Sequence, residues 1–230
     1  MSTAWLYALI PAAAVVLGAA VAVRRPPGPA ATAAIQHFAA GVVFAAAATE
    51  ILPGLKHEGA ALPVALGGAA GVLAMLAVKR LGERASGPAG TVAVVAFDIM
   101  IDGLVLGIGF AAGAREGLLL TVALTLEVLF LGLSVTPGLL EALGSRARTV
   151  LAVAAMALLL PLGALLGVPV GRLPDPWLTG FFAFGLVALL YLVIEELLME
   201  AHEGGAEAPW ITATFFAGFL LLLLLEEATG

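Results

Sequence analysis

Acidic side chains interrupt stretches of this sequence that are otherwise apolar. Asp98 and Asp102 lie inside the run from Thr91 to Ala112, and Glu127 lies inside the next apolar run. An ionisable residue within a membrane span is costly to bury, and it usually faces a cavity or an ion path. The full set of such acidic positions is Glu50, Asp98, Asp102, Glu127, Glu195 and Glu196. Because all ten basic residues fall in or beside loops, this one-sided set predicts a path for a cation.

Three of these carboxylates are expected to converge near the middle of the membrane. Asp98 and Asp102 are four residues apart, so they share one face of a helix. The short connection at 112–116 makes the next helix an antiparallel neighbour, which places Asp102 level with Glu127. Such a cluster repels itself unless it is protonated or bridged by a divalent cation. We predict one metal site formed by Asp98, Asp102 and Glu127; the alternative is protonated carboxyl groups hydrogen-bonded between helices.

The three histidines stand near the ends of apolar runs. His37 lies near the start of the second run, where it either gates the ion path or hydrogen-bonds to a neighbouring helix. His57 and His202 are each followed by a Glu at a helix end. They either collect metal at the two mouths of the path or are ordinary interfacial residues.

The composition is that of a membrane protein. Hydrophobic residues make up 62% of the 230 residues, charged residues only 11%, and the mean hydropathy is +1.13. A soluble domain carries about 25% charged residues. The absence of Cys excludes thiolate ligands and disulfides, and the net charge of −6 argues against a nucleic-acid partner. The N-terminal segment lacks the basic start of a signal peptide, so we expect a retained first helix.

Loops rich in Pro, Gly and charge divide the chain into eight apolar runs. Their continuous apolar character predicts helices rather than barrel strands. The expected spans are residues 3–23, 31–55, 61–78, 91–112, 117–139, 149–170, 178–199 and 209–226. We predict an all-α integral membrane protein in which residues 1–230 form a single transmembrane transporter domain.

Basic residues indicate the side of the membrane on which each loop lies, because cytoplasmic loops are enriched in Lys and Arg. The loops after the first, third and fifth spans hold seven of them, and the loops after the second, fourth and sixth hold three. The seven are Arg24, Arg25, Lys79, Arg80, Arg84, Arg146 and Arg148. We expect this side to be cytoplasmic, with both termini outside the cytoplasm and the protein in the cell inner membrane.

Two segments of the sequence are similar to each other. The stretch EILPGLKHEG at 50–59 aligns without gaps to EELLMEAHEG at 195–204. These segments end spans that cross the membrane in opposite directions, which is typical of inverted-topology repeats in secondary transporters. We therefore expect the first three spans to be related to the last three by a half-turn about an axis in the membrane plane.

Four motifs resemble those of the ZIP family of zinc- and iron-permease-like metal transporters. They are HFAAGVVFAAAATEILP from His37, DIMIDG from Asp98, LLLPLGALLG from Leu158 and YLVIEELLMEAH from Tyr191. The last of these is the most specific match. The resemblance implies eight helices, both termini outside the cytoplasm, and helices 4 and 5 holding the metal centre between an inverted repeat of helices 1–3 and 6–8.

The resemblance also implies roles for three outlying carboxylates. Glu195 and Glu196 match the family's ligands near the cytoplasmic exit, and Glu50 stands near the outer end of helix 2, where a His or Asp is usual. Adjacent residues point about 100° apart on a helix, so Glu195 and Glu196 need not both face the path.

Several of the family's ligand positions are apolar here. The Asn of helix 4 is Ile99, the Glu before the helix 6 Pro is Leu160, and Phe130 occupies a ligand position of helix 5. A binuclear centre is therefore expected to be reduced to one all-oxygen site. Such a site is harder than one with imidazole ligands, so weaker discrimination among Zn, Cd, Mn and Fe is expected.

The expected function is secondary transport of a divalent metal cation through a carboxylate-lined path between helices 2, 4, 5 and 7. The ion is cargo, no cofactor is expected, and the partners are the lipid bilayer and a second copy in a homodimer. The sequence has no HExxH motif, nucleophile elbow or P-loop, which argues against an enzyme and against ATP-driven transport. Two alternatives stay open: a protein of this fold that carries another solute or protons, and a non-transporting membrane scaffold.

Overall fold

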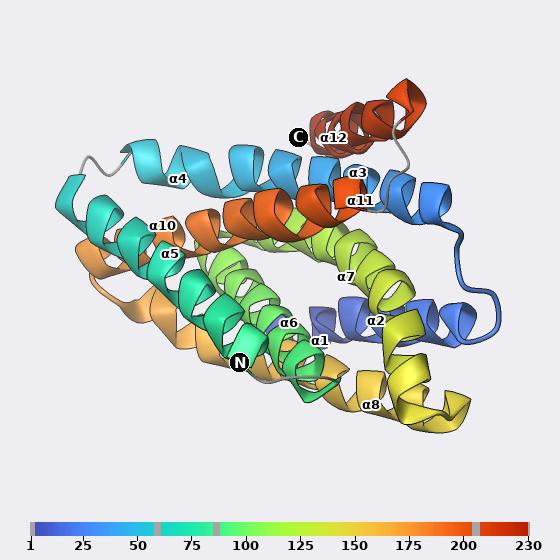
Figure 1. The fold of residues 1–230 in the computed structure, drawn as a ribbon. Coiled ribbons are helices and arrows are strands. Elements are labelled where there is room, and N and C mark those ends of the chain that lie inside the picture. The colour runs from blue at the N-terminus through green and yellow to red at the C-terminus, as the bar shows by residue number, and fades with distance from the viewer. Residues whose placement is uncertain (1–2, 58–60, 85–87, 204–207, 230) are drawn as a thin grey trace.

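The computed structural model of the chain is a bundle of helices (Figure 1). It describes residues 3–57, 61–84, 88–203 and 208–229, and within these ranges every regular element is helical. The α-helices are α1 (Ala4–Tyr7), α2 (Leu9–Ala22), α3 (Pro29–Ala46), α4 (Leu52–His57), α5 (Ala61–Arg84), α6 (Pro88–Ala112), α7 (Ala114–Leu143), α8 (Arg146–Ala157), α9 (Leu159–Gly167), α10 (Asp175–Tyr191), α11 (Met199–Glu203) and α12 (Pro209–Thr229). Two π-helical segments, η1 (Ala47–Ile51) and η3 (Leu192–Leu198), and the 3-10 segment η2 (Val168–Arg172) complete the set.

Within the described residues, eight helical stretches are long and apolar enough to cross a membrane, which confirms the predicted fold class. They cover Ala4–Ala22, Pro29–Ile51, Ala61–Gly82, Ala89–Ala112, Ala114–Leu143, Arg146–Arg172, Asp175–Leu198 and Pro209–Ala228. Helices α3 and α6 lie mostly inside the bundle, whereas α5 and α12 expose most of their length. Large apolar side chains such as Leu66 and Leu224 are exposed on these outer helices, as expected for surfaces that contact lipid.

The connections between spans alternate between the two ends of the bundle (Figure 1). One end holds the α2–α3 and α7–α8 connections, and we call it the basic end. It carries Arg24, Arg25, Arg80, Arg84, Arg146 and Arg148. The opposite end holds the α6–α7 connection with Arg115 and the segment η2 with Arg172. The site therefore has to be located along the axis between these two ends.

Small residues bring α6 close to α9, which fixes the depth of the buried carboxylates on α6. A Cβ added at Gly103 would collide with the Leu160 carbonyl, and one at Gly107 would collide with the Ala164 carbonyl. Gly163 faces the backbone of α6 in the same way. Each helix can approach the other only because these positions lack side chains. The contact sets the position of Asp102, which directly precedes Gly103.

Two spans change from α-helical to π-helical geometry where they carry carboxylates. Segment η1 contains Glu50, and η3 contains Glu195 and Glu196. A π-helical turn contains one extra residue, and such turns occur frequently at functional sites. The two similar sequence segments begin inside η1 and η3, so the irregularity falls at matching positions.

The packing of the spans is compatible with the predicted repeat. The most extensive helix pairs are α2 with α7, α6 with α9, α3 with α12, and α5 with α10. In the predicted repeat the first span corresponds to the sixth, the second to the seventh, the third to the eighth and the fourth to the fifth. When each span is replaced by its counterpart, every pair in this set becomes another pair of the set. The half-turn itself stays a prediction.

Candidate metal site

The three carboxylates predicted to bind metal are buried in the bundle. Asp98 and Asp102 lie on α6 with 4% and 0% of their surfaces exposed, and Glu127 lies on α7 with 2% exposed. Helices α6 and α7 are connected at Gly113 and pack against each other as antiparallel neighbours. The hairpin expected from the sequence therefore forms, and it keeps all three side chains away from the lipid.

Asp102 and Glu127 lack, among the described residues, the hydrogen-bond partners that normally compensate for burial. Both oxygens of Asp102 and both oxygens of Glu127 are buried without a hydrogen-bond partner among the described residues. Buried polar groups without partners are costly, and buried charges normally pair or coordinate a metal. Asp102 and Glu127 lie within electrostatic range of each other, and both lie within range of Glu196 on η3. Glu196, on the seventh span, is thus a fourth carboxylate at the centre. Asp98 belongs to the same group because it lies within electrostatic range of Glu127.

The carboxylates are close but are not arranged as ready ligands. In the part of the chain that the structure describes, no three His, Asp or Glu side chains are grouped tightly enough to hold one metal ion. A cation at the centre would have to draw the side chains inward. The prediction that Asp98, Asp102 and Glu127 share one ion is not tested by this arrangement and stays a prediction.

A cavity of about 420 Å³ reaches these carboxylates from the basic end, and we call it the vestibule. Its lining includes Gly90, near the start of α6, together with Asp98, Glu127, Glu195, Glu196 and Lys79. Asp102 is not part of this lining and lies deeper. Carboxylates from α6, α7 and η3 therefore meet in one cavity, which could admit a hydrated cation from the basic end.

One basic residue reaches into the vestibule. The Lys79 ammonium near the end of α5 lies 2.6 Å from a carboxylate oxygen of Glu195 and donates a hydrogen bond to it. The carboxylates in the spans were expected to have no buried Lys or Arg partner; Lys79 is not buried, but it reaches Glu195 from its position beside a loop. In the sequence Lys79 indicates only orientation, because its position beside a loop does not reveal this contact. Glu195 and Glu196 both line the vestibule; Glu195 pairs with Lys79, whereas Glu196 lies within electrostatic range of Asp102 and Glu127.

His37 and His202 face each other beside a second cavity, of about 410 Å³, at the basic end. Their ring centroids are 5.2 Å apart. The Nδ1 of His37 lies 2.9 Å from the Ala33 carbonyl, and the Nδ1 of His202 lies 2.7 Å from the Leu198 carbonyl. A carbonyl oxygen only accepts, so each Nδ1 is the donor, and in this tautomer Nε2 is the atom that could bind a metal. The Nε2 of His37 is buried and has no hydrogen-bond partner among the described residues.

The remaining predicted residues lie at the opposite end. Glu50 in η1 accepts a hydrogen bond from the Thr49 hydroxyl at 3.3 Å and lies within electrostatic range of Arg115 and Glu226. It does not line the vestibule. His57 ends α4, but its side chain lies outside what the structure describes. Of the two predicted mouth histidines, His202 is therefore the one whose surroundings the structure describes, and it lies beside His37.

Apolar contacts occupy the positions where the family resemblance implies further ligands. Leu160 is fully buried, and its backbone packs against Gly103. The Phe130 ring packs edge-on against Phe38, with centroids 6.0 Å apart. Neither side chain offers a metal ligand, so a second ion beside the first is not expected.

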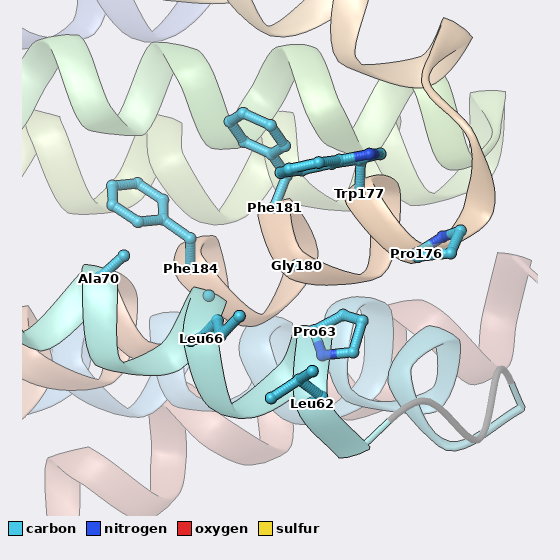
Figure 2. A pocket seen from close by; sticks show the side chains of 10 residues that line it. Leu62, Pro63, Leu66, Ala70, Pro176, Trp177, Gly180, Phe181 and Phe184 are labelled. Carbon is cyan, nitrogen blue, oxygen red and sulfur yellow. The ribbon is translucent and has the colours of Figure 1, made fainter.

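An apolar groove of about 470 Å³ lies between α5 and α10, near the opposite end of the bundle (Figure 2). Its lining includes Leu62, Leu66, Trp177, Phe181 and Phe184. The groove lies beside the close contact of Gly67 with Gly180. Because these side chains offer no carboxylate or imidazole, the groove does not belong to the cation path.

Comparison with known proteins agrees with the motif resemblance. No protein-family model matches the chain. The zinc transporter ZIPB of Bordetella bronchiseptica is 34% identical over 137 residues, covering 56% of this chain and 42% of that protein. The zinc transporter GufA of Myxococcus xanthus is 29% identical over 130 residues, covering 56% of this chain and 51% of that protein. The chain is thus similar to two named zinc transporters, in agreement with the motifs that resemble those of the ZIP family.

The chain spans about half the length of the curated relatives it matches. Both relatives are named transporters, and the eight apolar helical stretches make the chain an integral membrane protein. Three features of the chain were not found from its sequence: the ion pair of Lys79, the facing imidazoles and the π-helical segments. The repeat was a signal for the π-helical segments, because its two copies begin at Glu50 in η1 and at Glu195 in η3.

Proposed function

We propose that this protein is a ZIP-type secondary transporter of divalent metal cations and not an enzyme. The observation that carries the proposal is the vestibule, which joins the basic end to Asp98 and Glu127 and is lined by carboxylates from three spans. The names of the two relatives support a metal as cargo. The path runs between the second, fourth, fifth and seventh spans, which hold His37 on α3, Asp98 on α6, Glu127 on α7 and Glu196 in η3.

The ion at the centre is bound by oxygen ligands. Asp98, Asp102 and Glu127 hold one cation, and water or backbone oxygen completes its coordination. An oxygen site accepts Mn²⁺ and Fe²⁺ readily, but the Irving–Williams order still favours Zn²⁺ over Mn²⁺. We therefore expect Zn²⁺, Cd²⁺, Mn²⁺ and Fe²⁺ all to bind, with weaker discrimination than imidazole ligands would give. The absence of ligands at Leu160 and Phe130 limits the centre to a single ion.

The two facing imidazoles serve the same path at its basic end. Hydrogen bonds from Nδ1 to backbone carbonyls hold both rings with Nε2 as the atom that could bind a metal, and second-sphere bonds of this kind orient metal-ligating histidines. His37 and His202 collect the ion near the mouth. Glu50 has the corresponding role at the other mouth.

The basic end faces the cytoplasm of the cell inner membrane, and both termini lie outside. This orientation rests on the excess of Lys and Arg in the loops at that end. The vestibule then opens to the cytoplasm, and the structure corresponds to an inward-facing state. A homodimer in the lipid bilayer, with no nucleic-acid partner, is the assembly that we propose.

Uptake into proteoliposomes tests the transport proposal. We expect wild-type protein to accumulate Zn²⁺ or Cd²⁺ down a gradient, and we expect Asp102→Ala to lose this uptake. Asp175→Asn is a matched control, because Asp175 lies at the start of α10, outside the cavity that holds the central carboxylates. If no divalent ion in a panel of Zn, Cd, Mn, Fe, Co, Ni and Mg is taken up, metal transport is excluded.

One observation favours a second candidate, a protein of this fold that carries protons or another solute. The central carboxylates, as described, are not grouped as a ready metal site. Metal-dependent protection against thermal unfolding separates the candidates, because a ligand that binds only the folded protein stabilises it. Protection by Cd²⁺ that Asp102→Ala abolishes supports the metal transporter, and protection that is absent in wild type supports the alternative.

A further inference from the structure

An ion pair crosses the wall of the vestibule and joins two spans. Lys79 on α5 and Glu195 on η3 are 116 residues apart in sequence, yet their charged atoms are 2.6 Å apart. Their side chains are 44% and 32% exposed, so both remain accessible from the cavity. Both residues line the vestibule together with Asp98 and Glu127.

A fixed cation is unexpected in the wall of a cation path. Its charge repels an arriving metal ion, and its hydrogen bond engages a carboxylate oxygen that the metal would otherwise use. The Lys79 ammonium therefore weakens metal binding at Glu195. A path that must release its ion gains from the same feature, because an ion held firmly at its exit passes through slowly.

We propose that Lys79 is an internal competitor for Glu195 and that it keeps metal release at the basic end fast. This inference rests on the transport proposed above. When an ion moves from Asp98 and Glu127 towards Glu195, it exchanges with the Lys79 ammonium. The ammonium then returns to Glu195 and displaces the ion towards the basic end. Lys79 is thus a positioning residue that acts on Glu195 and does not bind the ion.

The chemistry of lysine suits this exchange. Its ammonium is a compact charge on a flexible stem, whereas the Arg guanidinium forms a planar, two-pronged contact with a carboxylate. An accessible ion pair contributes little free energy, so a divalent ion can displace it. The pair is therefore weak enough to open in each cycle and close enough to re-form.

Equilibrium binding and release of Cd²⁺ by the purified full chain test the proposal. We expect Lys79→Gln to bind Cd²⁺ about threefold to fivefold more tightly and to release it correspondingly more slowly, as expected for loss of one accessible ion pair. Lys79→Arg keeps the charge and should keep the weak binding. A purely structural role for Lys79 predicts the opposite sign, because a damaged fold binds metal less well.

Two controls show whether the effect acts through Glu195. Arg80→Gln removes one charge at the next residue of α5, where no ion pair to Glu195 exists, and should leave binding unchanged. In a Glu195→Gln background, Lys79→Gln should have no further effect. Unchanged affinity and release in Lys79→Gln, or an equal change in the Glu195→Gln background, overturns the role of Lys79 while leaving metal transport intact. Wild-type protein that binds no Cd²⁺ overturns the proposed function itself.

Discussion

The two halves of the proposed path differ in how they are filled. On the side of the basic end, cavities of about 420 and 410 Å³ lie beside carboxylates and imidazoles. On the other side of Asp102, the cavity between Ile51, Val105 and Phe182 has only about 10 Å³, roughly the space of a single water molecule. Close glycine contacts between α6 and α9 occupy this closed half. A chain with one open half and one closed half has the form that alternating access requires.

The difference also shows where movement is needed. The open half is bounded by α5, α6, α7 and η3, and its cavity of about 420 Å³ leaves room for water and ions beside the carboxylates. The closed half is sealed by backbone-to-backbone packing, which cannot open by rotation of side chains alone. We expect opening of the outer half to require displacement of α6 and α9 together relative to α3 and α10. The π-helical segments η1 and η3 lie on those partner spans and are suited to absorb such a displacement.

Labelling of introduced cysteines gives the largest expected contrast between the halves. The chain has no Cys of its own, so each variant carries a single thiol. Ser134→Cys, in the vestibule, should react rapidly with a water-soluble maleimide, whereas Val105→Cys, in the closed half, should not react. In sealed vesicles of known orientation, reaction of the first variant only from the cytoplasmic side supports the orientation. Equal rates for the two variants would show that the halves do not differ.

Removal of a central carboxylate should give the next largest effect. Asp102→Asn keeps the side-chain volume but removes a charged ligand, so we expect metal affinity to fall by at least about tenfold. Isothermal titration with Cd²⁺ in detergent measures the change. Asp175→Asn provides the comparison, since it removes the same charge far from the centre. Similar losses in both variants would point to general electrostatics rather than to a site at Asp102.

Acidic conditions should weaken binding at the same centre. Carboxylate ligands must be deprotonated to bind a metal, so protons compete with the ion. We expect affinity to decrease as the pH falls, by about tenfold per pH unit for each proton that the metal displaces. A pH series of Cd²⁺ titrations measures this dependence. Affinity that is constant from neutral to mildly acidic pH would mean that no proton is displaced from the carboxylates.

The close contact of α6 with α9 can be tested separately from metal binding. Gly103→Ala places a methyl group against the Leu160 carbonyl, and such overpacking costs about 2 kcal/mol. We expect a lower thermal unfolding midpoint for this variant. Gly138→Ala in α7 is the control, because a Cβ there meets no atom within 4 Å, and alanine favours a helix. If Gly103→Ala is as stable as Gly138→Ala, the contact does not hold the closed half together.

The sequence predicted the parts of this molecule that depend on composition and on the spacing of apolar and charged residues. Eight spans and a helical bundle follow from apolar runs separated by Pro, Gly and charge, and the burial of Asp98, Asp102 and Glu127 follows from their positions within those runs. Gly103 and Gly107 have the four-residue spacing typical of close helix contacts, but their packing partner, the Gly163–Gly167 pair, depends on how spans distant in sequence come together.

The side-chain partnerships could not be predicted for the same reason. Lys79 and Glu195 are far apart in sequence, and a lysine near a loop usually extends towards water. Its contact with Glu195 depends on the direction in which α5 ends and on the local π-helical geometry of η3. The sequence likewise places His37 and His202 at the same end of the bundle, but it contains no information on the 5.2 Å between their rings.

The imidazole pair should give the smallest effect among these variants. His37 and His202 line a cavity that shares no lining residue with the vestibule. Ions that pass Glu195 through the vestibule can therefore bypass the imidazoles. His37→Ala or His202→Ala should therefore slow uptake about threefold, a free-energy change below about 1 kcal/mol, and leave central affinity unchanged. Thr212→Ala, which changes the same cavity without removing an imidazole, should transport at the wild-type rate. A parallel loss of central affinity in both His variants would mean that the pair supports the bundle. An uptake rate equal to wild type in the double variant would exclude the pair from the path.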